Sequence, residues 1–576
     1  MSGSWDGPAE CAGAAAKLRF GPAPEIGLAA LAGTLFLFHL GTYGLWPDEA
    51  RYAEIAREMV IGQGLIVPHL NYVAYVEKPP LLYWVTALSF HWFGINQFAA
   101  RFPSALFAVI GVVAVYLFGL RVFDRPRALL ASAILITSPL YALMAQVVTP
   151  DITLTALITI ALFAIFLGIA RRGAWIWVAY GAMGLGVLTK GLVALALPLL
   201  AAWVFLLWEG ELRDGLKRLR LLPGLALVGA ISAWWFILLA VREPGFLTFY
   251  FWDEHVRRFL DPTYSHREAF YYYLPVLAAG MAPWSVIGAV LLCLRPSRTP
   301  HAARAFCLLA PVITVAFFSA AQSKLAPYIL PALPPLALLV ADLIVSCASS
   351  ADRGGSEPAS GVRSTARVLA VLSVVMAAAG IGTFALGLGA TRFANPYLIL
   401  VHPSLIASGL ILFVGGTISA ASFARPCLRS GFAAVVATVA LALMAASYGR
   451  LEVEPRRSFA AFSREVAARA GDAQIICYGR YVHAMPFYTR RRVILIGPLT
   501  ELRFGAERAS DAKSYFFDSD DALLRLWRQP NPVVVILDQS ELNRLRPMLG
   551  AFRIIAQARG KLAVMRDNSP RPNNPA

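Results

Sequence analysis

Thirteen apolar segments dominate this sequence, and they constrain the fold more than any motif does. Hydrophobic residues make up 58% of the 576 residues, and charged residues make up only 15%. A soluble domain could not bury so much apolar surface, whereas a chain that crosses a bilayer many times can. The composition therefore predicts a polytopic α-helical membrane protein. The segments are 25–45, 102–120, 128–146, 152–170, 175–189, 191–208, 221–241, 271–294, 305–320, 328–347, 367–389, 398–420 and 431–448.

The basic residues predict the orientation of these segments, because Lys and Arg in short loops stay on the cytoplasmic side. Six alternate connections are basic, and Lys17 and Arg19 precede the first segment. All of them lie on one side of the membrane if the N-terminus is cytoplasmic. An odd number of spans then places everything after residue 449 on the outer side. The basic loops also account for much of the net charge of +17, and no nucleic-acid partner is expected.

The sequence after residue 449 predicts a separate domain, because hydropathy falls and short β-type runs alternate with helical patterns. This alternation is typical of a small α/β domain. We expect a membrane domain (1–449), an outer α/β domain (450–568) and a disordered tail (569–576), with a further disordered insert at 349–361. The β-type runs are 474–478, 492–496 and 533–537, and the helical patterns are 458–470, 519–528 and 540–549.

The first outer loop, 46–101, is longer than a simple connector needs to be. Within it, 50–61 and 80–93 have the pattern of amphipathic helices, and we expect the charged face of the first to lie along the membrane surface. The pair Asp48-Glu49 precedes the first helix, and Glu77-Lys78 precedes the second. Ionised residues next to a span are functional suspects, so this loop is expected to form a site.

Further ionisable residues fall on the same predicted face. Asp151 begins a span, where helix capping would also explain it, and Lys190 interrupts apolar sequence, where snorkelling to the interface is the alternative. Bases facing acids suit a substrate with a phosphodiester head group and a lipid tail, because Lys and Arg hold phosphate oxygens. The acids would serve as base, sugar-binding group or metal ligand. The acids are Asp48, Glu49, Glu77 and Asp151, and the bases are Arg51, Lys78, Lys190, Arg257, Arg258, Arg267 and Lys324.

Several of these residues lie in strings that resemble one family, in the same order, over most of residues 40–335. The family is that of the bacterial aminoarabinose transferases of lipid A. It belongs to the GT-C superfamily of polyprenyl-phosphate-sugar glycosyltransferases, which also contains the protein O-mannosyltransferases. The strings are Asp48–Met59, Glu77–Trp84, Phe98–Ser104, Thr149–Asp151, Leu188–Gly191, Glu254-His255, Arg258-Phe259, His266-Arg267, Tyr272–Pro275 and Ser323–Pro331.

The resemblance implies a polytopic GT-C fold of about thirteen transmembrane helices in the bacterial inner membrane, with a periplasmic C-terminal domain. It implies a reaction as well: the family moves 4-amino-4-deoxy-L-arabinose from undecaprenyl phosphate to a lipid A phosphate, which confers polymyxin resistance. We expect the chain to act as a monomer.

By the same resemblance, Asp48 and Asp151 match the family's catalytic acids. Glu77 with either His255 or His266 matches a metal contact, so a divalent metal is considered as a cofactor without being required. We expect an inverting displacement, with cations neutralising the departing phosphate. The residues assigned to the donor phosphate or the cavity are Arg51, Lys78, Lys190, Arg258, Lys324 and Tyr328.

Two other functions remain open. One is a glycosyltransferase of the same fold that uses another polyprenyl-phosphate sugar and a glycan or protein acceptor. The other is a transporter of lipid-linked sugars, which would carry ionisable groups near the middle of its spans and internal repeats. The charges instead collect on one face and no repeat is visible, which favours chemistry at that face.

Overall fold

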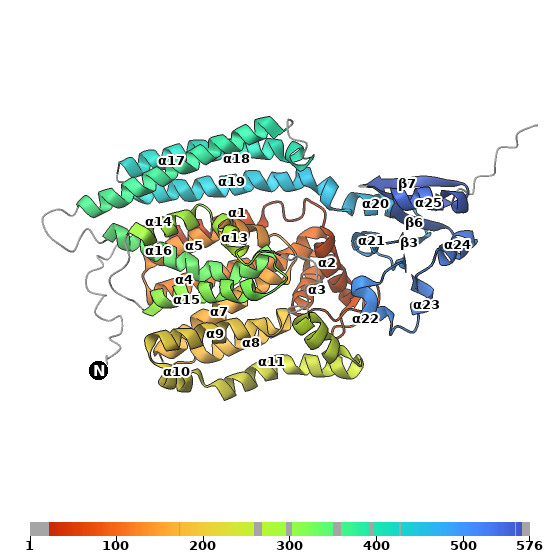
Figure 1. The fold of residues 1–576 in the computed structure, drawn as a ribbon, viewed down its shortest axis with the longest axis horizontal. Coiled ribbons are helices and arrows are strands. Elements are labelled where there is room, and N and C mark those ends of the chain that lie inside the picture. Colours follow the sequence, from red (N-terminus) through yellow and green to blue (C-terminus); the bar gives the residue numbers. More distant parts are fainter. Residues whose placement is uncertain are drawn as a thin grey trace, which may run out of the picture.

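The protein is described here by a computed structural model that covers residues 22–171, 173–257, 268–294, 302–349, 359–390, 396–425, 428–558 and 560–566. Long helices form a bundle, and a small domain with a β-sheet lies at one end of it (Figure 1). The tail at 569–576 and most of the insert at 349–361 lie outside the described residues.

The polytopic α-helical fold is confirmed, whereas the count of thirteen spans is not. Among the described residues, eight helices are long and apolar enough to cross a membrane, or nine if one bent pair counts as a single span. That pair is α13 (Tyr273–Gly280) and α14 (Trp284–Leu294), bent by 107°. The segment 128–146 is also broken, into α5 (Arg125–Ile136) and α6 (Pro139–Met144), because Pro139 has no N–H to continue the first helix.

Each remaining apolar segment coincides with one helix, or with a 3-10 turn and the helix that follows it. These elements are α1 (Ala23–Leu37), α4 (Gln97–Val122), α7 (Pro150–Arg171), α8 (Trp175–Lys190), α9 (Val193–Glu209), α11 (Leu221–Arg242), α15 (Ala302–Ala320), η3 (Ala326–Ala332) with α16 (Leu333–Ser349), α17 (Ala359–Gly389), α18 (Pro396–Ala424) and α19 (Leu428–Arg457), and the short α10 (Leu212–Leu219) connects two of them.

Helix α7 is the centre of the bundle, with 94% of its apolar stretch buried. A helix that is apolar all round is stable only where other helices surround it. Helices α17, α18 and α19 pack side by side as an outer layer (Figure 1). The beginning of α7 is therefore fixed by the bundle, which matters because Asp151 lies there.

The first outer loop forms the two expected helices, α2 (Pro47–Val60) and α3 (Leu81–Phe93), with a small hairpin of β1 (His69–Leu70) and β2 (Val73–Ala74) between them. The expected charged face of α2 along the membrane surface is wrong. Glu54, Arg57 and Glu58 are at most 2% exposed, because α2 packs against α3 and against the C-terminal domain.

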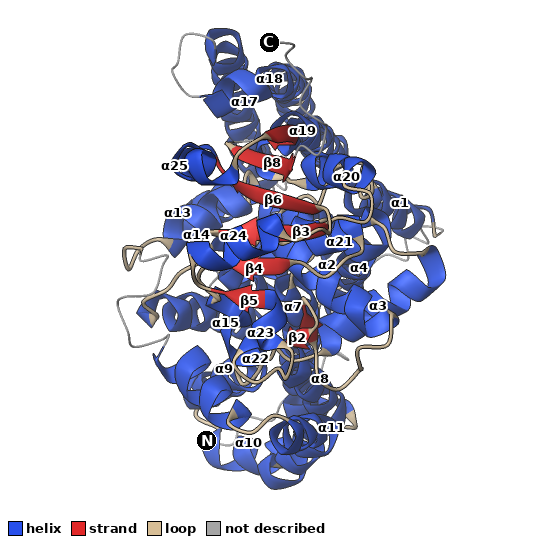
Figure 2. Ribbon diagram, turned by 90° about the vertical axis from the view of Figure 1, so that its right-hand side faces the viewer, coloured by secondary structure: helices blue, strands red, loops and turns tan. Residues whose placement is uncertain are grey.

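The C-terminal domain contains a six-stranded sheet in the order β5-β4-β3-β6-β8-β7, which faces the viewer in Figure 2. The first four strands run parallel, and β8 is antiparallel to both of its neighbours. The three predicted strands are present as β3 (Gln474–Tyr478), β4 (Ile494–Ile496) and β6 (Val533–Asp538). The strands that we did not predict are β5 (Phe516–Phe517), β7 (Phe552–Ala558) and β8 (Lys561–Arg566).

Successive side chains of a strand point to opposite faces of the sheet, and both faces of this sheet are apolar. On β3, Ile476 and Tyr478 pack with α24 and α25, whereas Ile475 and Cys477 share a core with α2, α3, α20 and α21. One face of the sheet is thus continuous with the core of the first outer loop. The helices are α20 (Ala460–Arg469), α21 (Ala484–Thr489), α24 (Asp520–Arg528) and α25 (Gln539–Leu549), and the short turns are η5 (Thr500–Leu502), α22 (Arg503–Ala506) and α23 (Ala512–Tyr515).

Two of the contacts between the domain and the first outer loop are especially close. The Asn71 side-chain amide donates to the carbonyl oxygen of Val493 and accepts from its N–H, both at 2.9 Å. Gly505 approaches Ala74 so closely that a Cβ at position 505 would lie 2.3 Å from the Ala74 carbonyl oxygen. Only glycine fits at such a contact. The domain therefore contacts the β1–β2 hairpin through backbone atoms as well as through side chains.

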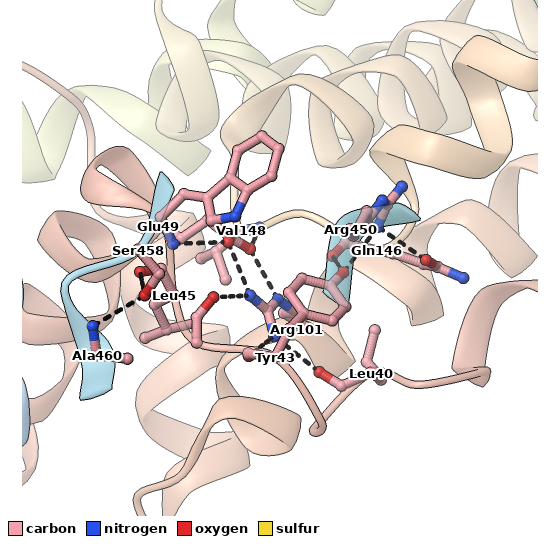
Figure 3. A network of polar contacts seen from close by, with 12 residues as sticks. Leu40, Tyr43, Leu45, Glu49, Arg101, Gln146, Val148, Arg450, Ser458 and Ala460 are labelled. Atoms are coloured by element: carbon pink, nitrogen blue, oxygen red, sulfur yellow. Dashed lines mark hydrogen bonds and ion pairs between the residues drawn. The ribbon is translucent and has the colours of Figure 1, made fainter. Parts of the chain in front are cut away.

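A buried ion pair joins the loop to the bundle (Figure 3). Arg101 of α4 donates from Nε and Nη2 to the two carboxylate oxygens of Glu49, both at 2.8 Å, and neither residue is more than 2% exposed. Arg101 also donates to the carbonyl oxygens of Leu40, Tyr43 and Gly44. Burial by itself would raise the pKa of Glu49, but the charge and hydrogen bonds of Arg101 outweigh it, so the pKa is lowered.

Replacing Arg101 by Met should destabilise the protein strongly, because the Glu49 carboxylate would stay buried without its charge partner. The expected loss is about 3–5 kcal/mol of the free energy of unfolding, measured by reversible unfolding of the full chain in mixed detergent micelles. Arg213→Met, at an exposed position of α10, is the matched control and should change little. An equal effect of the two substitutions would contradict the structural role of the pair.

A second buried carboxylate should make the stability depend on pH. Burial raises the pKa of Glu58 well above its ordinary value of 4.5, and the neighbouring Glu54 raises it further. A carboxyl whose pKa is raised on folding stabilises the fold while it is protonated, so the free energy of unfolding falls as pH rises above 4.5.

Glu58→Gln should therefore flatten the pH dependence of the thermal midpoint between about pH 4.5 and 8. Glu465→Gln changes a more exposed carboxylate of α20 and should leave the wild-type slope in place. Parallel curves for wild type and Glu58→Gln would count against this effect.

Candidate functional site

Two ion pairs form the centre of the candidate site. The first lies on α2, where Arg51 Nη2 is 2.9 Å from Asp48 Oδ1. The Asp48 side chain is 74% exposed, whereas the Arg51 side chain is only 19% exposed. The sequence places Asp48 in the first turn of α2, where the helix dipole favours an acid. Asp48 is thus held by one neighbour and remains open to solvent.

The second pair lies where α7 begins and α8 ends. Lys190 Nζ is 2.5 Å from Asp151 Oδ1, and the same nitrogen lies 4.2 Å from the centre of the Tyr328 ring. Asp151 therefore does more than begin a helix, and Lys190 does not simply extend to the membrane surface. An ammonium held between a carboxylate and an aromatic face is stabilised by both, as in a cation–π contact.

Tyr52 of α2 connects the two pairs. Burial raises the pKa of the Tyr52 hydroxyl, Asp48 and Asp151 raise it further, and Arg51 and Lys190 oppose this. All four charges must therefore lie within electrostatic range of one hydroxyl. Nothing in the sequence marks Tyr52 as a site residue, because tyrosine carries no charge at neutral pH, although Tyr52 stands within the same motif as Asp48 and Arg51.

Glu77 extends the site toward a buried tyrosine cluster. The Tyr75 hydroxyl donates to Glu77 Oε2 at 2.8 Å, and the charges of Glu77 and Arg51 both act on Tyr75 and Tyr83. Burial raises the pKa of both tyrosines well above 10.0, so their hydroxyls remain protonated. The Tyr75 hydroxyl donates to Glu77, whereas the Tyr83 hydroxyl has no hydrogen-bond partner among the described residues.

The two further lysines of the prediction donate to backbone. Lys78 Nζ lies 3.2 Å from the Glu77 carbonyl oxygen. Lys324 lies in the segment that leads to Tyr328 in η3 and is 5% exposed. It donates to the carbonyl oxygens of Ala321 and Glu268. The structure brings together Asp48, Arg51, Glu77, Asp151, Lys190 and Tyr328 through shared neighbours, and roles for Lys78 and Lys324 remain predictions.

The outer loop that contains His255, Arg258 and His266 is only partly described. Arg258 and His266 lie outside the described residues, and His255 lies in η2 (Thr248–Arg257), where its side chain is not described. In the part of the chain that is described, no group of three His, Cys, Asp or Glu residues could hold a metal ion. Of the predicted metal ligands, Glu77 is the one whose side chain the structure describes, and it accepts a hydrogen bond from the Tyr75 hydroxyl. A metal at Glu77 stays a prediction.

Two family models match the chain. Residues 77–237 match the model described as dolichyl-phosphate-mannose-protein mannosyltransferase, and residues 463–566 match the aminoarabinose transferase C-terminal domain. The first match begins at Glu77 and includes Asp151 and Lys190. The second match covers the six-stranded sheet.

Two similar proteins carry the same name. An undecaprenyl phosphate-alpha-4-amino-4-deoxy-L-arabinose arabinosyl transferase of Pseudomonas fluorescens is 37% identical over 322 residues, which cover 54% of this chain and 58% of the relative. A transferase of the same name from Erwinia tasmaniensis is 37% identical over 317 residues, or 53% of this chain and 56% of the relative. The chain thus matches somewhat more than half the length of these curated relatives.

A solved structure extends the likeness to the whole chain. The crystal structure of ArnT from Cupriavidus metallidurans bound to undecaprenyl phosphate superposes with a TM-score of 0.83 at 26% identity, over 96% of this chain and 99% of that one. Fold and site together define a polytopic membrane protein of the GT-C type. Within that class, the chain is similar to the undecaprenyl phosphate-aminoarabinose arabinosyl transferases, as the sequence motifs predicted.

A double-mutant cycle should detect the pair of Asp151 and Lys190 as a stabilising contact. Lys190→Met and Asp151→Asn should each destabilise the protein, and the coupling energy should reach about 1 kcal/mol or more, because both side chains are mostly buried. The measurement is again reversible unfolding in mixed micelles.

The pair Asp214–Lys217 of α10 offers a matched control. Its atoms lie 3.2 Å apart, but both side chains are more than two-thirds exposed, so the coupling should stay below about 0.5 kcal/mol. Equal coupling in both cycles would show that burial does not strengthen the pair at Asp151.

Proposed function

We propose that this protein is a membrane glycosyltransferase that moves 4-amino-4-deoxy-L-arabinose from undecaprenyl phosphate to a lipid A phosphate. The observation that supports this most is the likeness, over nearly the full length of both chains, to ArnT bound to undecaprenyl phosphate. The charged site at one end of the bundle fits a donor with a phosphate head group and a lipid tail.

In this proposal, cations hold the donor phosphate. Lys190 is the best-placed candidate, because Asp151 and Tyr328 fix its ammonium where α8 ends. Arg51 is a second candidate, because its charge and that of Lys190 both lower the pKa of Tyr52. Lys78, Arg258 and Lys324 are further candidates from the sequence. As the bond between the sugar C1 and the phosphate oxygen breaks, the electron pair stays on the phosphate, and nearby cations stabilise that charge.

Asp48 is proposed to meet the acceptor, because its carboxylate is the most exposed group of the site. A lipid A phosphate is already anionic, so its oxygen can attack C1 from the opposite face without losing a proton. Asp48 would then orient the sugar or its amino group. A hydroxyl acceptor would instead transfer its proton to Asp48. Asp151 acts by positioning Lys190.

The proposed setting is the bacterial inner membrane, with a cytoplasmic N-terminus and the C-terminal domain in the periplasm. This orientation is supported by the alternation of basic loops and by the position of the site at the same end of the bundle as the C-terminal domain (Figure 1). Residues 1–449 would form the membrane domain and residues 450–568 the periplasmic one. A monomer is proposed as the working unit.

A second candidate is a transferase of the same fold that uses another polyprenyl-phosphate sugar. The match of residues 77–237 to the dolichyl-phosphate-mannose-protein mannosyltransferase model favours it, because that stretch contains much of the candidate site. The acceptor in this case would be a glycan or a protein.

Mass spectrometry of lipid A and of polyprenyl phosphates, from cells with and without the protein, should distinguish the two candidates. The first predicts that a pentosamine increment on lipid A disappears with the protein. The second predicts that lipid A is the same in both kinds of cell and that a different lipid-linked sugar accumulates in cells without the protein.

Asp48→Asn and Asp151→Asn should each reduce transfer by at least about 100-fold in reconstituted membranes, because each acid is proposed to position a group that takes part in the reaction. Asp472→Asn changes a fully exposed carboxylate of the C-terminal domain and should leave transfer unchanged. Wild-type product yield from both site variants, at equal amounts of folded protein, would rule out the proposed roles of these acids.

A further inference from the structure

A groove of about 200 Å³ lies away from the candidate site, between α1, α6 and α19. Its walls are largely apolar, with Leu35 and Phe38 at α1, Leu143 on α6, and Leu443 and Met444 on α19. Three polar side chains line it as well, those of Gln146, Ser447 and Arg450. The groove is open on one side, so it can admit an elongated ligand from the surroundings of the bundle.

Arg450 is the unusual feature of this groove. Its Nη1 donates to the Tyr43 hydroxyl at 2.7 Å and to Gln146 Oε1 at 2.8 Å, as Figure 3 shows. Its Nη2 lies 3.4 Å from the Leu143 carbonyl oxygen. All of these acceptors are neutral. Among the described residues, no carboxylate lies within ion-pair distance of Arg450.

Arg450 is partly exposed, so its guanidinium can bind an anion from the surroundings of the bundle. The neutral acceptors fix its orientation without cancelling the charge. Tyr43 is itself fixed, because the Arg101 guanidinium lies 3.9 Å from the centre of the Tyr43 ring and donates to the Tyr43 carbonyl oxygen. The Tyr43 hydroxyl therefore holds the Arg450 guanidinium in place. Arg450 is therefore a preformed cation that lacks an anion in the described structure.

The position of Arg450 indicates what that anion is. The residue follows the apolar stretch of α19 directly and lies at the end of the bundle nearest the C-terminal domain, where lipid head groups would meet the helices (Figure 1). We propose that the groove binds one anionic phospholipid, with an acyl chain against Leu35, Phe38 and Met444 and the phosphate on Arg450. Arginine matches phosphate through charge-assisted hydrogen bonds.

This site is separate from the proposed transfer reaction, because it uses none of the residues assigned to the donor or the acceptor. The groove is nevertheless connected to the buried pair of Glu49 and Arg101. Gln146 contacts Arg450 directly, and two residues later the N–H of Val148 donates to Glu49 Oε1 at 3.1 Å. A bound lipid would thus stabilise the segment that leads from α6 to the start of α7.

Native mass spectrometry of the purified full chain tests the proposal, with phosphatidylglycerol as the probe and phosphatidylcholine as the neutral comparison. Wild type should retain phosphatidylglycerol about ten-fold better than phosphatidylcholine, and Arg450→Gln should lose this preference. Arg450→Lys should retain part of it. Arg456→Gln removes an exposed arginine of the same helix and should behave as wild type.

A second variant tests the groove itself without touching Arg450. Ala446 is an exposed residue of the groove lining, and Ala446→Trp should fill the opening and displace the lipid while the fold persists. Equal retention of phosphatidylglycerol by wild type, Arg450→Gln and Ala446→Trp would overturn the proposal. So would a preference for glycerol phosphate, without acyl chains, equal to that for the lipid.

Discussion

The pair of Glu49 and Arg101 holds the outer loop to the membrane bundle, and the candidate site depends on it. Glu49 closes the start of α2 by accepting from the N–H of Trp46, and it reaches Val148, three residues before Asp151. One carboxylate thus sets the relative position of the helix that carries Asp48 and the helix that carries Asp151. Because the pair is fully buried, solvent cannot take over the role of either partner.

The sequence predicted the helices of the bundle well, since apolar runs leave few other options in a membrane. The count of thirteen spans is not confirmed, because hydropathy does not register a break in direction. Pro139 divides one run, and the 107° bend between α13 and α14 divides another. In the C-terminal domain, the three consecutive apolar runs were predictable, whereas β5 has only two residues and no local pattern can identify it.

The candidate site was predictable to the extent that it is charged. Asp48, Asp151 and Lys190 stand out because ionised residues are rare near spans. Tyr52 and Tyr75 carry no such signal, and their role follows from what surrounds them in space. The charges at Glu54, Arg57 and Glu58 led to a wrong prediction, that of an exposed face. Helical periodicity places them on a polar face, and only the packing of α21 on α2 shows that this face is buried.

The double hydrogen bond between Asn71 and Val493 has a consequence for how the chain matures. Asn71 adopts a φ of +55°, a conformation that needs outside support, and its partner lies 422 residues further along the chain. At about 5–20 residues per second, synthesis reaches Val493 roughly 20–80 s after Asn71. The Asn71 contact of the outer loop therefore forms only after residue 493 has been translated, and a chain that stops before it lacks this support.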